Sequence, residues 1–188
     1  MFYDHVKRIV EGLLFVSGEP LSVKKLSEML EMDQENILLL LERLIDDYNK
    51  SEHGITIAEV AGGYQFCTRP EIAPYIEKMY KPQVSVLSPA ALETLSIIAF
   101  KQPVTRLEIE GIRGVKIDSA LNTLLDRKLV KEVGRKEGLG RPILYGTTAE
   151  FLRQFGLKDL SDLPSLPDVR LTEQEVNIEL AHKESETG

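Results

Sequence analysis

Hydrophobic residues in the first 50 positions recur at the three- and four-residue spacing of amphipathic helices. The stretch from Val6 to Leu14 predicts a first helix. Ser22 and Asp33 are favourable N-cap residues and predict the starts of a second and a third helix. The apolar stripe of the third helix would consist of Ile37, Leu41, Leu44, Ile45 and Tyr48.

Two runs with the character of β-strands follow, at 55–60 and 64–68, and Ala61-Gly62-Gly63 separates them. Glycines between two such runs favour a hairpin. Three helices followed by a hairpin is the element order of a winged-helix domain, which is built on a helix-turn-helix. Pro70, Pro74 and Pro82 bracket a short helical or irregular segment, and 82–88 has the character of a linker.

The second half of the chain repeats this order, and Pro103 corresponds to Pro20 at an offset of 83 residues. Ser88-Pro89 predicts the start of a helix, and Thr105 to Glu108 has the spacing of a capping box for the next one. Asp118 predicts the cap of a third helix. The core stripes of the first and third of these helices would be Leu92, Leu95, Ile98 and Ala99, and Leu121, Leu124 and Leu125.

Strands at 129–133 and 143–147, around a glycine-rich turn, and a closing helix from Thr148 to Gly156 complete the repeat. We therefore expect an α+β, mainly α, fold of two tandem winged-helix domains, at 1–82 and 83–167. Residues 168–188 contain six acidic and two basic side chains, which is typical of a disordered acidic tail. Thr172 to Glu175 would allow a tail helix to form on a partner.

The overall charge is acidic, −7 with a sequence pI of about 5.1, which disfavours a protein that works mainly by binding DNA phosphates. Cys67 is the only cysteine, so no intramolecular disulfide forms and a reducing cytoplasm is the expected compartment. The N-terminal stretch carries charged residues and lacks the uninterrupted apolar core of a signal peptide. No run of about 18 apolar residues occurs, so we expect no membrane association.

Both predicted third helices carry carboxylates where a DNA-reading helix needs basic or amide side chains. Asp33 and Glu35 begin the first of these helices, and Asp118 begins the second. The wing of the second half is more basic. Its cations are Lys131, Arg135, Lys136 and Arg141, and two glutamates reduce their net charge to +2. The sequence predicts weak, salt-sensitive contact to DNA there at most, and a solvated turn explains the same residues.

No constellation of catalytic or metal-binding residues is apparent. The three histidines, His5, His53 and His182, lie in separate segments, and neither a P-loop nor a dinucleotide-binding motif occurs. We therefore expect a protein without enzymatic activity, cofactor, metal or small-molecule substrate.

Several apolar residues lie off the predicted core stripes. Ile97 and Phe100 fall outside the stripe of their helix, and Phe15 and Leu39 do so in the first half. Such residues either pack against a neighbouring element of the same domain or form a surface for a partner. For Phe15 and Leu39 we favour self-association.

Four stretches of the sequence resemble the segregation and condensation protein B (ScpB) family of the bacterial SMC–kleisin complex. They are VEGLLFVSGEPLS, LSPAALETLSIIAFKQPVTRLEIEGIRGV, GRPILYGTT and EFLRQFGLKDLSDLP. The resemblance extends over about residues 5–167 and leaves the tail outside it.

This resemblance implies two winged-helix domains, a homodimer formed through the N-terminal domains, and binding of the central part of the kleisin ScpA, which bridges the SMC ATPase heads. The complex would compact and partition the chromosome, so the protein would be cytoplasmic and associated with the nucleoid. We expect the dimer contact at Phe15 and Leu39, and the kleisin contact at Ile97, Phe100, Gln102, Pro103, Thr105, Arg106 and Arg113. The alternatives are a winged-helix DNA-binding protein that uses the wing at 131–141, and an adaptor for another cytosolic complex.

Overall fold

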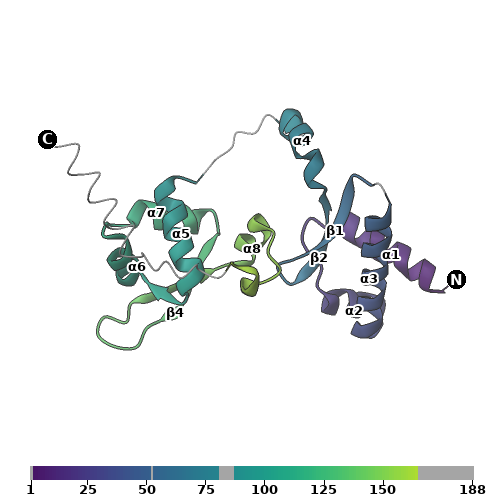
Figure 1. Cartoon of the computed structure of the whole chain (residues 1–188). Coiled ribbons are helices and arrows are strands. Elements are labelled where there is room, and N and C mark those ends of the chain that lie inside the picture. The colour runs from purple at the N-terminus through teal and green to yellow at the C-terminus, as the bar shows by residue number, and fades with distance from the viewer. Residues whose placement is uncertain (1, 52, 81–86, 165–188) are drawn as a thin grey trace, which may run out of the picture.

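The computed structural model describes residues 2–51, 53–80 and 87–164, and its described part is a mainly helical α+β structure with two small sheets (Figure 1). This confirms the expected mixed, mainly α class. Most of the expected linker at 82–88 and all of the expected tail at 168–188, including the tail helix, lie outside the described residues.

Three helices begin the chain as expected: α1 (Phe2–Val16), α2 (Val23–Leu30) and α3 (Gln34–Lys50). Ser22 caps α2, since its side chain accepts a hydrogen bond from the N–H of Lys25. Asp33 stands at the N-cap of α3 but makes no side-chain capping bond, so the cap chemistry expected there is wrong. The buried hydrophobic residues of these helices are Val6, Val10, Leu14, Leu26, Ile37, Leu40, Leu41 and Leu44.

The first hairpin consists of β1 (Ile55–Val60) and β2 (Gly63–Thr68), and its turn has two residues. Ala61 and Gly62 adopt φ angles of +51° and +72°, the left-handed backbone that tight hairpins require. Gly63, expected in the turn, is instead the first residue of β2. A Cβ atom there would lie 2.9 Å from backbone carbons of Pro20 and Leu21, so only glycine allows this close approach.

A short helical segment follows the hairpin, as the prolines indicate. It comprises the 3₁₀ helix η1 (Pro70–Ile72) and α4 (Ala73–Tyr80). No residue of α4 is buried, and Tyr75, Met79 and Tyr80 are strongly exposed. α4 therefore contributes little to the hydrophobic core.

The helices of the second half are α5 (Pro89–Lys101), α6 (Arg106–Arg113) and α7 (Asp118–Asp126). Ser88 caps α5 by accepting from the N–H of Ala91, with Pro89 at the first helical position. Asp118 is not the cap of α7. The N-cap is Ile117, and Asp118 is the first helical residue.

The second sheet has three antiparallel strands in the order β3-β5-β4. They are β3 (Val104–Thr105), β4 (Val130–Arg135) and β5 (Ile143–Thr147). The sequence did not predict β3, because two residues are too few for a period-two pattern. A register shift between Glu132 and Gly134 marks a bulge in β4.

The closing helix α8 (Ala149–Phe155) has the predicted limits, with Thr148 as its cap and Gly156 in the left-handed region at its end. The 3₁₀ helix η2 (Leu160–Asp162) follows.

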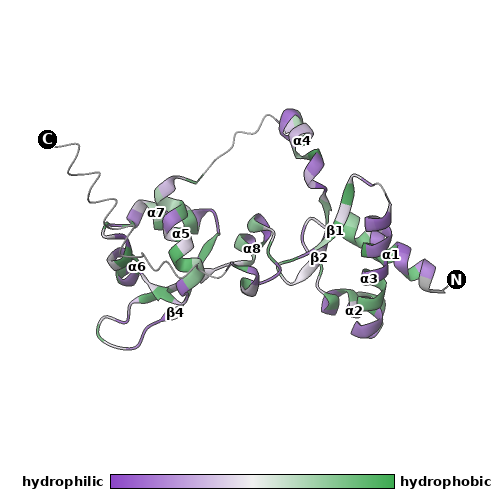
Figure 2. Ribbon diagram, viewed as in Figure 1, coloured by the Kyte–Doolittle hydropathy of each residue, from purple (hydrophilic) through white to green (hydrophobic). Residues whose placement is uncertain are grey.

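The buried hydrophobic residues form two separate clusters, one drawn from residues 6–57 and one from residues 87–151. Figure 2 shows that hydrophobic residues concentrate where the helices of each half meet. In Figure 1, α8 lies between helices α5–α7 and the first hairpin, and the chain after α8 contacts this hairpin. The halves are called the N-half (residues 2–80) and the C-half (residues 87–164) below.

Candidate partner-binding surfaces

The buried face of α5 differs from the predicted one. Leu95, Ile98 and Ala99 are buried as expected, but Leu92 is exposed, and the small residues Ala91 and Thr94 take its place in the core. Small side chains at these positions let the neighbouring helices approach closely, and Thr94 satisfies its hydroxyl by donating to the carbonyl of Ala90. The core stripe of α5 is therefore rotated from the one that hydrophobicity alone predicts.

Ile97 and Phe100, the two residues expected off this stripe, have different environments. Ile97 is half-buried and packs against the core of the C-half. Phe100 leaves 37% of its surface exposed at the last turn of α5. Phe100 is thus available to a partner, whereas much of Ile97 already has an internal role.

Gln102 and Thr147 tie the end of α5 to strand β5. The Gln102 side-chain NH₂ donates to the hydroxyl of Thr147 at 3.0 Å and to the carbonyl of Ala99 at 3.1 Å. The backbone N–H of Thr147 donates to Gln102 Oε1 at 2.7 Å. These bonds commit both ends of the Gln102 amide to the fold. The next residue, Pro103, is exposed and follows a cis peptide bond.

Thr105 begins α6 with the predicted capping box. Its hydroxyl accepts from the N–H of Glu108, and its own N–H donates to Glu108 Oε2 at 2.8 Å. Lys136, just after β4, donates to the other oxygen of the same carboxylate at 2.6 Å. The Lys136 ammonium, together with the N–H and hydroxyl of Thr105, lowers the pKa of Glu108 to about 2. Thr105 itself is buried, so its side chain supports α6 from inside.

Arg106 joins α6 to α7. Its guanidinium donates to Glu110 at 3.0 Å and to Asp118 at 2.6 Å, and the hydrogen bonds to Asp118 and Glu110 raise its pKa further. More than a third of its side chain is exposed, so it can also face a partner.

Arg113 joins α6 to α5 and is far less accessible, with only 10% of its side chain exposed. It donates to the Thr94 hydroxyl at 3.1 Å and to Glu93 at 2.9 Å. Its Nε is buried and has no hydrogen-bond partner within the described residues. The structure therefore uses Arg113 mainly as an internal tie between two helices.

A hollow of about 430 Å³ lies beside the residues just described. Lys101, Pro103, Val104, Glu108 and Ile112 line it. Ile112 and the neighbouring Leu107 leave 51% and 70% of their surfaces exposed. Neither residue was among the predicted contact residues. Helical spacing could have indicated Leu107. It lies two residues, or about 200°, from the buried Ile109, which places the two side chains on nearly opposite faces of α6.

The four cations of the expected wing, Lys131, Arg135, Lys136 and Arg141, are all exposed. The ion pair with Glu108 neutralises Lys136. Arg135 donates one hydrogen bond to the carbonyl of Arg141 at 3.2 Å. A carbonyl carries no formal charge, so this contact does not neutralise the guanidinium. The positive charge that this segment presents to solvent is therefore smaller than a count of its cations indicates.

In the N-half, Phe15 and Leu39 are exposed at 78% and 50%, as expected for residues off the core stripes. Phe15 lines a hollow whose apolar walls are Tyr48, Ile55 and Phe66. Leu39 lies nine residues before Tyr48 on α3, roughly 13 Å along the helix axis. The two residues thus occupy different parts of the N-half surface.

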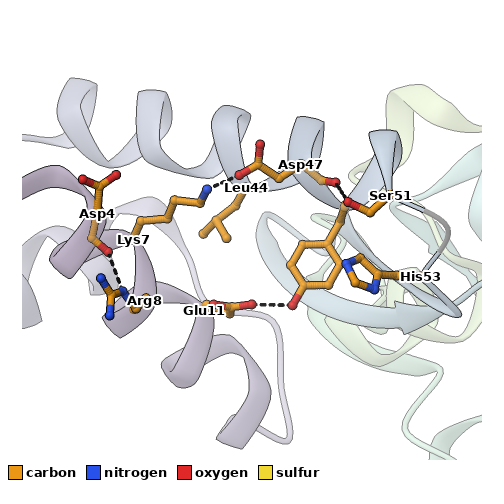
Figure 3. A pocket seen from close by; sticks show the side chains of 9 residues that line it. Asp4, Lys7, Arg8, Glu11, Leu44, Asp47, Ser51 and His53 are labelled. Carbon is orange, nitrogen blue, oxygen red and sulfur yellow. Dashed lines mark hydrogen bonds and ion pairs between the residues drawn. The ribbon is translucent and has the colours of Figure 1, made fainter. Parts of the chain in front are cut away.

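A polar pocket of about 360 Å³ lies between α1 and the end of α3, and Figure 3 shows the side chains that line it. Lys7 pairs with Asp47, and the hydroxyl of Tyr48 donates to Glu11. The hydrogen bond to the Glu11 carboxylate, with burial, raises the pKa of Tyr48 to about 12. The Tyr48 ring also lies 5.0 Å from the ring of His53 and 5.1 Å from that of Phe66. These contacts join α1, α3 and the hairpin, and they pair Lys7, Glu11 and Asp47 within the fold.

Within the described ranges, no three His, Cys, Asp or Glu side chains come together in a way that could hold a metal ion. No helix in the same ranges is long and apolar enough to cross a bilayer.

Comparison with known proteins gives one consistent result. Segregation and condensation protein B of Desulforamulus reducens is 51% identical over 178 residues, covering 95% of this chain and 98% of the relative. The same protein of Moorella thermoacetica is 54% identical over 173 residues, covering 92% and 89%. A crystal structure of a dimer of the ScpB N-terminal domain complexed with an ScpA peptide is 32% identical, covers 42% of this chain and 99% of that one, and gives a TM-score of 0.40.

The family model described as segregation and condensation complex subunit ScpB matches residues 8–166, which is most of the chain. With relatives above 50% identity over nearly their whole length, the match establishes the family that the four sequence stretches indicated. This protein belongs to the ScpB family of segregation and condensation complex subunits.

Proposed function

We propose that this protein is a non-enzymatic subunit of an SMC–kleisin complex, in which it dimerises and binds the central region of the kleisin ScpA. The observation that carries the proposal is the family match over residues 8–166. Through ScpA it would connect to SMC, and it would support chromosome condensation and segregation in the cytoplasm, at the nucleoid.

We further propose that residues 1–82 and 83–167 form two winged-helix domains. Two features support this assignment. Each half contains three helices followed by an antiparallel hairpin, and each half has its own hydrophobic cluster. In this assignment the hairpin at 130–147 is the wing of the C-terminal domain, and the acidic tail lies outside both domains.

The kleisin surface that we propose is centred on the hollow beside α6. Phe100, Pro103, Leu107 and Ile112 offer exposed apolar surface there or next to it. A partner helix with apolar residues at three- and four-residue spacing fits such a surface. Lys101 and Glu108 carry opposite charges at the edge of the hollow and would contact polar residues of that helix.

The seven residues first expected to contact the kleisin fall into two groups in this proposal. Phe100, Pro103 and Arg106 are accessible and would contact it directly. Ile97, Gln102, Thr105 and Arg113 would hold the surface in shape, since each has internal packing or internal hydrogen bonds.

The test is a Phe100→Ala, Arg106→Ala double variant, assayed for capture of the central region of ScpA. We expect a dissociation constant at least tenfold larger, because a few aromatic and arginine side chains often contribute much of the free energy of an interface. Arg106 also ties α6 to α7, so the melting temperature and oligomeric state must be measured alongside. Undiminished capture by a folded, dimeric variant would exclude this surface.

For dimerisation, we propose that the N-half contacts a second copy through two separate parts of its surface, one at Phe15 and one at Leu39. Exposure of large apolar side chains on a small domain supports this. Sedimentation equilibrium of the full chain should show a dimer, and Phe15→Ser or Leu39→Ser should shift it toward monomer. Met29→Ser, which changes another exposed apolar residue, is the matched control and should leave the dimer intact. A dimer unaffected by both variants would place the interface elsewhere.

A second candidate function is DNA binding through the wing, for which the exposed cations Lys131, Arg135 and Arg141 are the supporting observation. We propose at most weak contact, because Lys136 is paired and the chain as a whole is acidic. Duplex affinity at two salt concentrations distinguishes the functions. Strong, salt-dependent binding that is abolished by replacing Arg135 and Arg141 would favour the DNA-binding alternative.

A further inference from the structure

The turn of the first hairpin and the chain after α8 are joined by two main-chain hydrogen bonds. The N–H of Ala61 donates to the carbonyl of Leu157 at 2.9 Å, and the N–H of Gly62 donates to the carbonyl of Lys158 at 3.0 Å. In a two-residue hairpin turn, the N–H groups of the two turn residues take no part in the hydrogen bonds between the strands. Here a segment almost a hundred residues away in sequence supplies their acceptors. Residues 157–158 are called the strap below.

Two polar contacts accompany these bonds. Lys158 Nζ lies 3.5 Å from Glu59 Oε2, next to the turn. Arg153 of α8 donates to the carbonyl of Gly18, in the loop before α2, at 3.3 Å. These contacts connect the N-half to α8 and to the residues after it, and Figure 1 shows α8 next to the first hairpin.

Each side of this junction is fixed to its own half. On one side, Leu157 packs against the core of the C-half, and its N–H donates to the carbonyl of Leu152 at 2.9 Å. On the other side, Leu21 and Tyr64 exchange two hydrogen bonds of 2.9 Å just after the turn. Because neither side is a free loop, forming the junction sets how the two halves are oriented.

We propose that the strap is a reversible latch that is closed in the free protein and holds the N-half and C-half in one orientation. It is reversible because none of the residues that make the contacts between the two halves is buried, and exposed hydrogen bonds and ion pairs open at low cost in free energy. A partner that spans both halves meets one arrangement of surfaces when the latch is closed and a variable one when it is open.

The proposal concerns the protein without any partner, so its outcome is independent of whether the chain binds ScpA. The direct test is amide hydrogen exchange, measured by NMR on the full chain at Ala61 and Gly62. In Glu59→Lys, the new lysine and Lys158 would repel each other, so the ion pair is lost and the latch opens. If the latch is closed in the wild type, both amides should exchange at least tenfold more slowly there than in this variant. The amide of Tyr64, which is bonded within the N-half, reports whether the hairpin itself stays intact.

Charge exchange gives the matched control. In a Glu59→Lys, Lys158→Glu double variant the ion pair is restored with reversed polarity, and the protection of Ala61 and Gly62 should return. If Glu59→Lys also accelerates exchange at Tyr64, the single variant Lys158→Glu, which leaves the hairpin unchanged, decides instead. Unprotected Ala61 and Gly62 amides in the wild type would overturn the proposal. So would protection that neither Glu59→Lys nor Lys158→Glu reduces.

Discussion

Lys136 donates a hydrogen bond of 2.6 Å to the carboxylate of Glu108, and so connects the wing to the capping box of α6. The same carboxylate accepts the N–H and hydroxyl of Thr105 at 2.8 Å each. One side chain thus connects the start of α6, strand β3 before it and Lys136 after β4. Val104 of β3 and Glu108 and Ile112 of α6 line the hollow that we propose as the kleisin surface.

The Glu108 contacts predict a specific loss of stability in acid. Its pKa is lowered from 4.5 to about 2 in the folded protein, so the ionised form stabilises the fold fully above about pH 4.5. This contribution is lost as the pH falls from 4.5 through about 2. The free energy of unfolding, measured by urea denaturation at several pH values, should therefore decrease over that range more steeply in the wild type than in Glu108→Gln.

Other carboxylates also titrate in this range, so the informative quantity is the difference between wild type and variant. A difference that stays constant from about pH 6 to about pH 2.5 would show that the carboxylate of Glu108 has an ordinary pKa and that these contacts do not form in solution.

Tyr48 provides a prediction at the alkaline end. Its pKa is raised from 10.0 to about 12, mainly by the hydrogen bond to Glu11. The neutral phenol therefore stabilises the fold fully below pH 10. This contribution is lost as the pH rises through about 12. The absorbance titration of wild type minus Tyr48→Phe should show one phenolate forming near pH 12. In Glu11→Gln the same group should titrate closer to 10. A Tyr48 titration near 10 in the wild type would contradict the pairing.

Two substitutions on α6 compare the effect of a buried and an exposed apolar side chain on the free energy of unfolding. Ile109 is fully buried, and replacing it with alanine should lower the free energy of unfolding by about 2–5 kcal/mol. Leu107, two residues earlier, is largely exposed, and its replacement should change stability by no more than about 0.5 kcal/mol. Chemical denaturation of both variants measures this. Equal losses would mean that α6 presents a different face to the core.

Local signals in the sequence were sufficient for most of the helix limits. Ser88, Thr105 and Thr148 each cap the helix that they were expected to begin, and Gly156 ends α8. Caps are predictable because a residue and a backbone N–H three positions away decide them. The cap predicted at Asp118 is wrong, since Ile117 occupies the N-cap position and the Asp118 carboxylate pairs with Arg106, twelve residues away in sequence.

Features that depend on tertiary contacts were less accessible to sequence reasoning. Leu92 is exposed although it is the largest apolar residue near the start of α5, because Ala91 and Thr94 fit better against the neighbouring elements. The internal roles of Gln102 and Arg113 were also missed, since their partners Thr147 and Glu93 are distant in sequence. Polar residues in a segment that resembles a family can therefore support a surface without contacting the partner.

The most direct measurement of the central claim is a calorimetric titration of the full chain with the central region of ScpA. The wild type should bind, and a Leu107→Ser, Ile112→Ser variant should bind at least tenfold more weakly, about 1.4 kcal/mol, with an unchanged melting temperature. Leu139→Ser, a fully exposed position on the wing turn, is the matched control and should bind as the wild type does. Equal affinity in all three proteins, or no binding by the wild type, would contradict the proposal that this surface docks the kleisin.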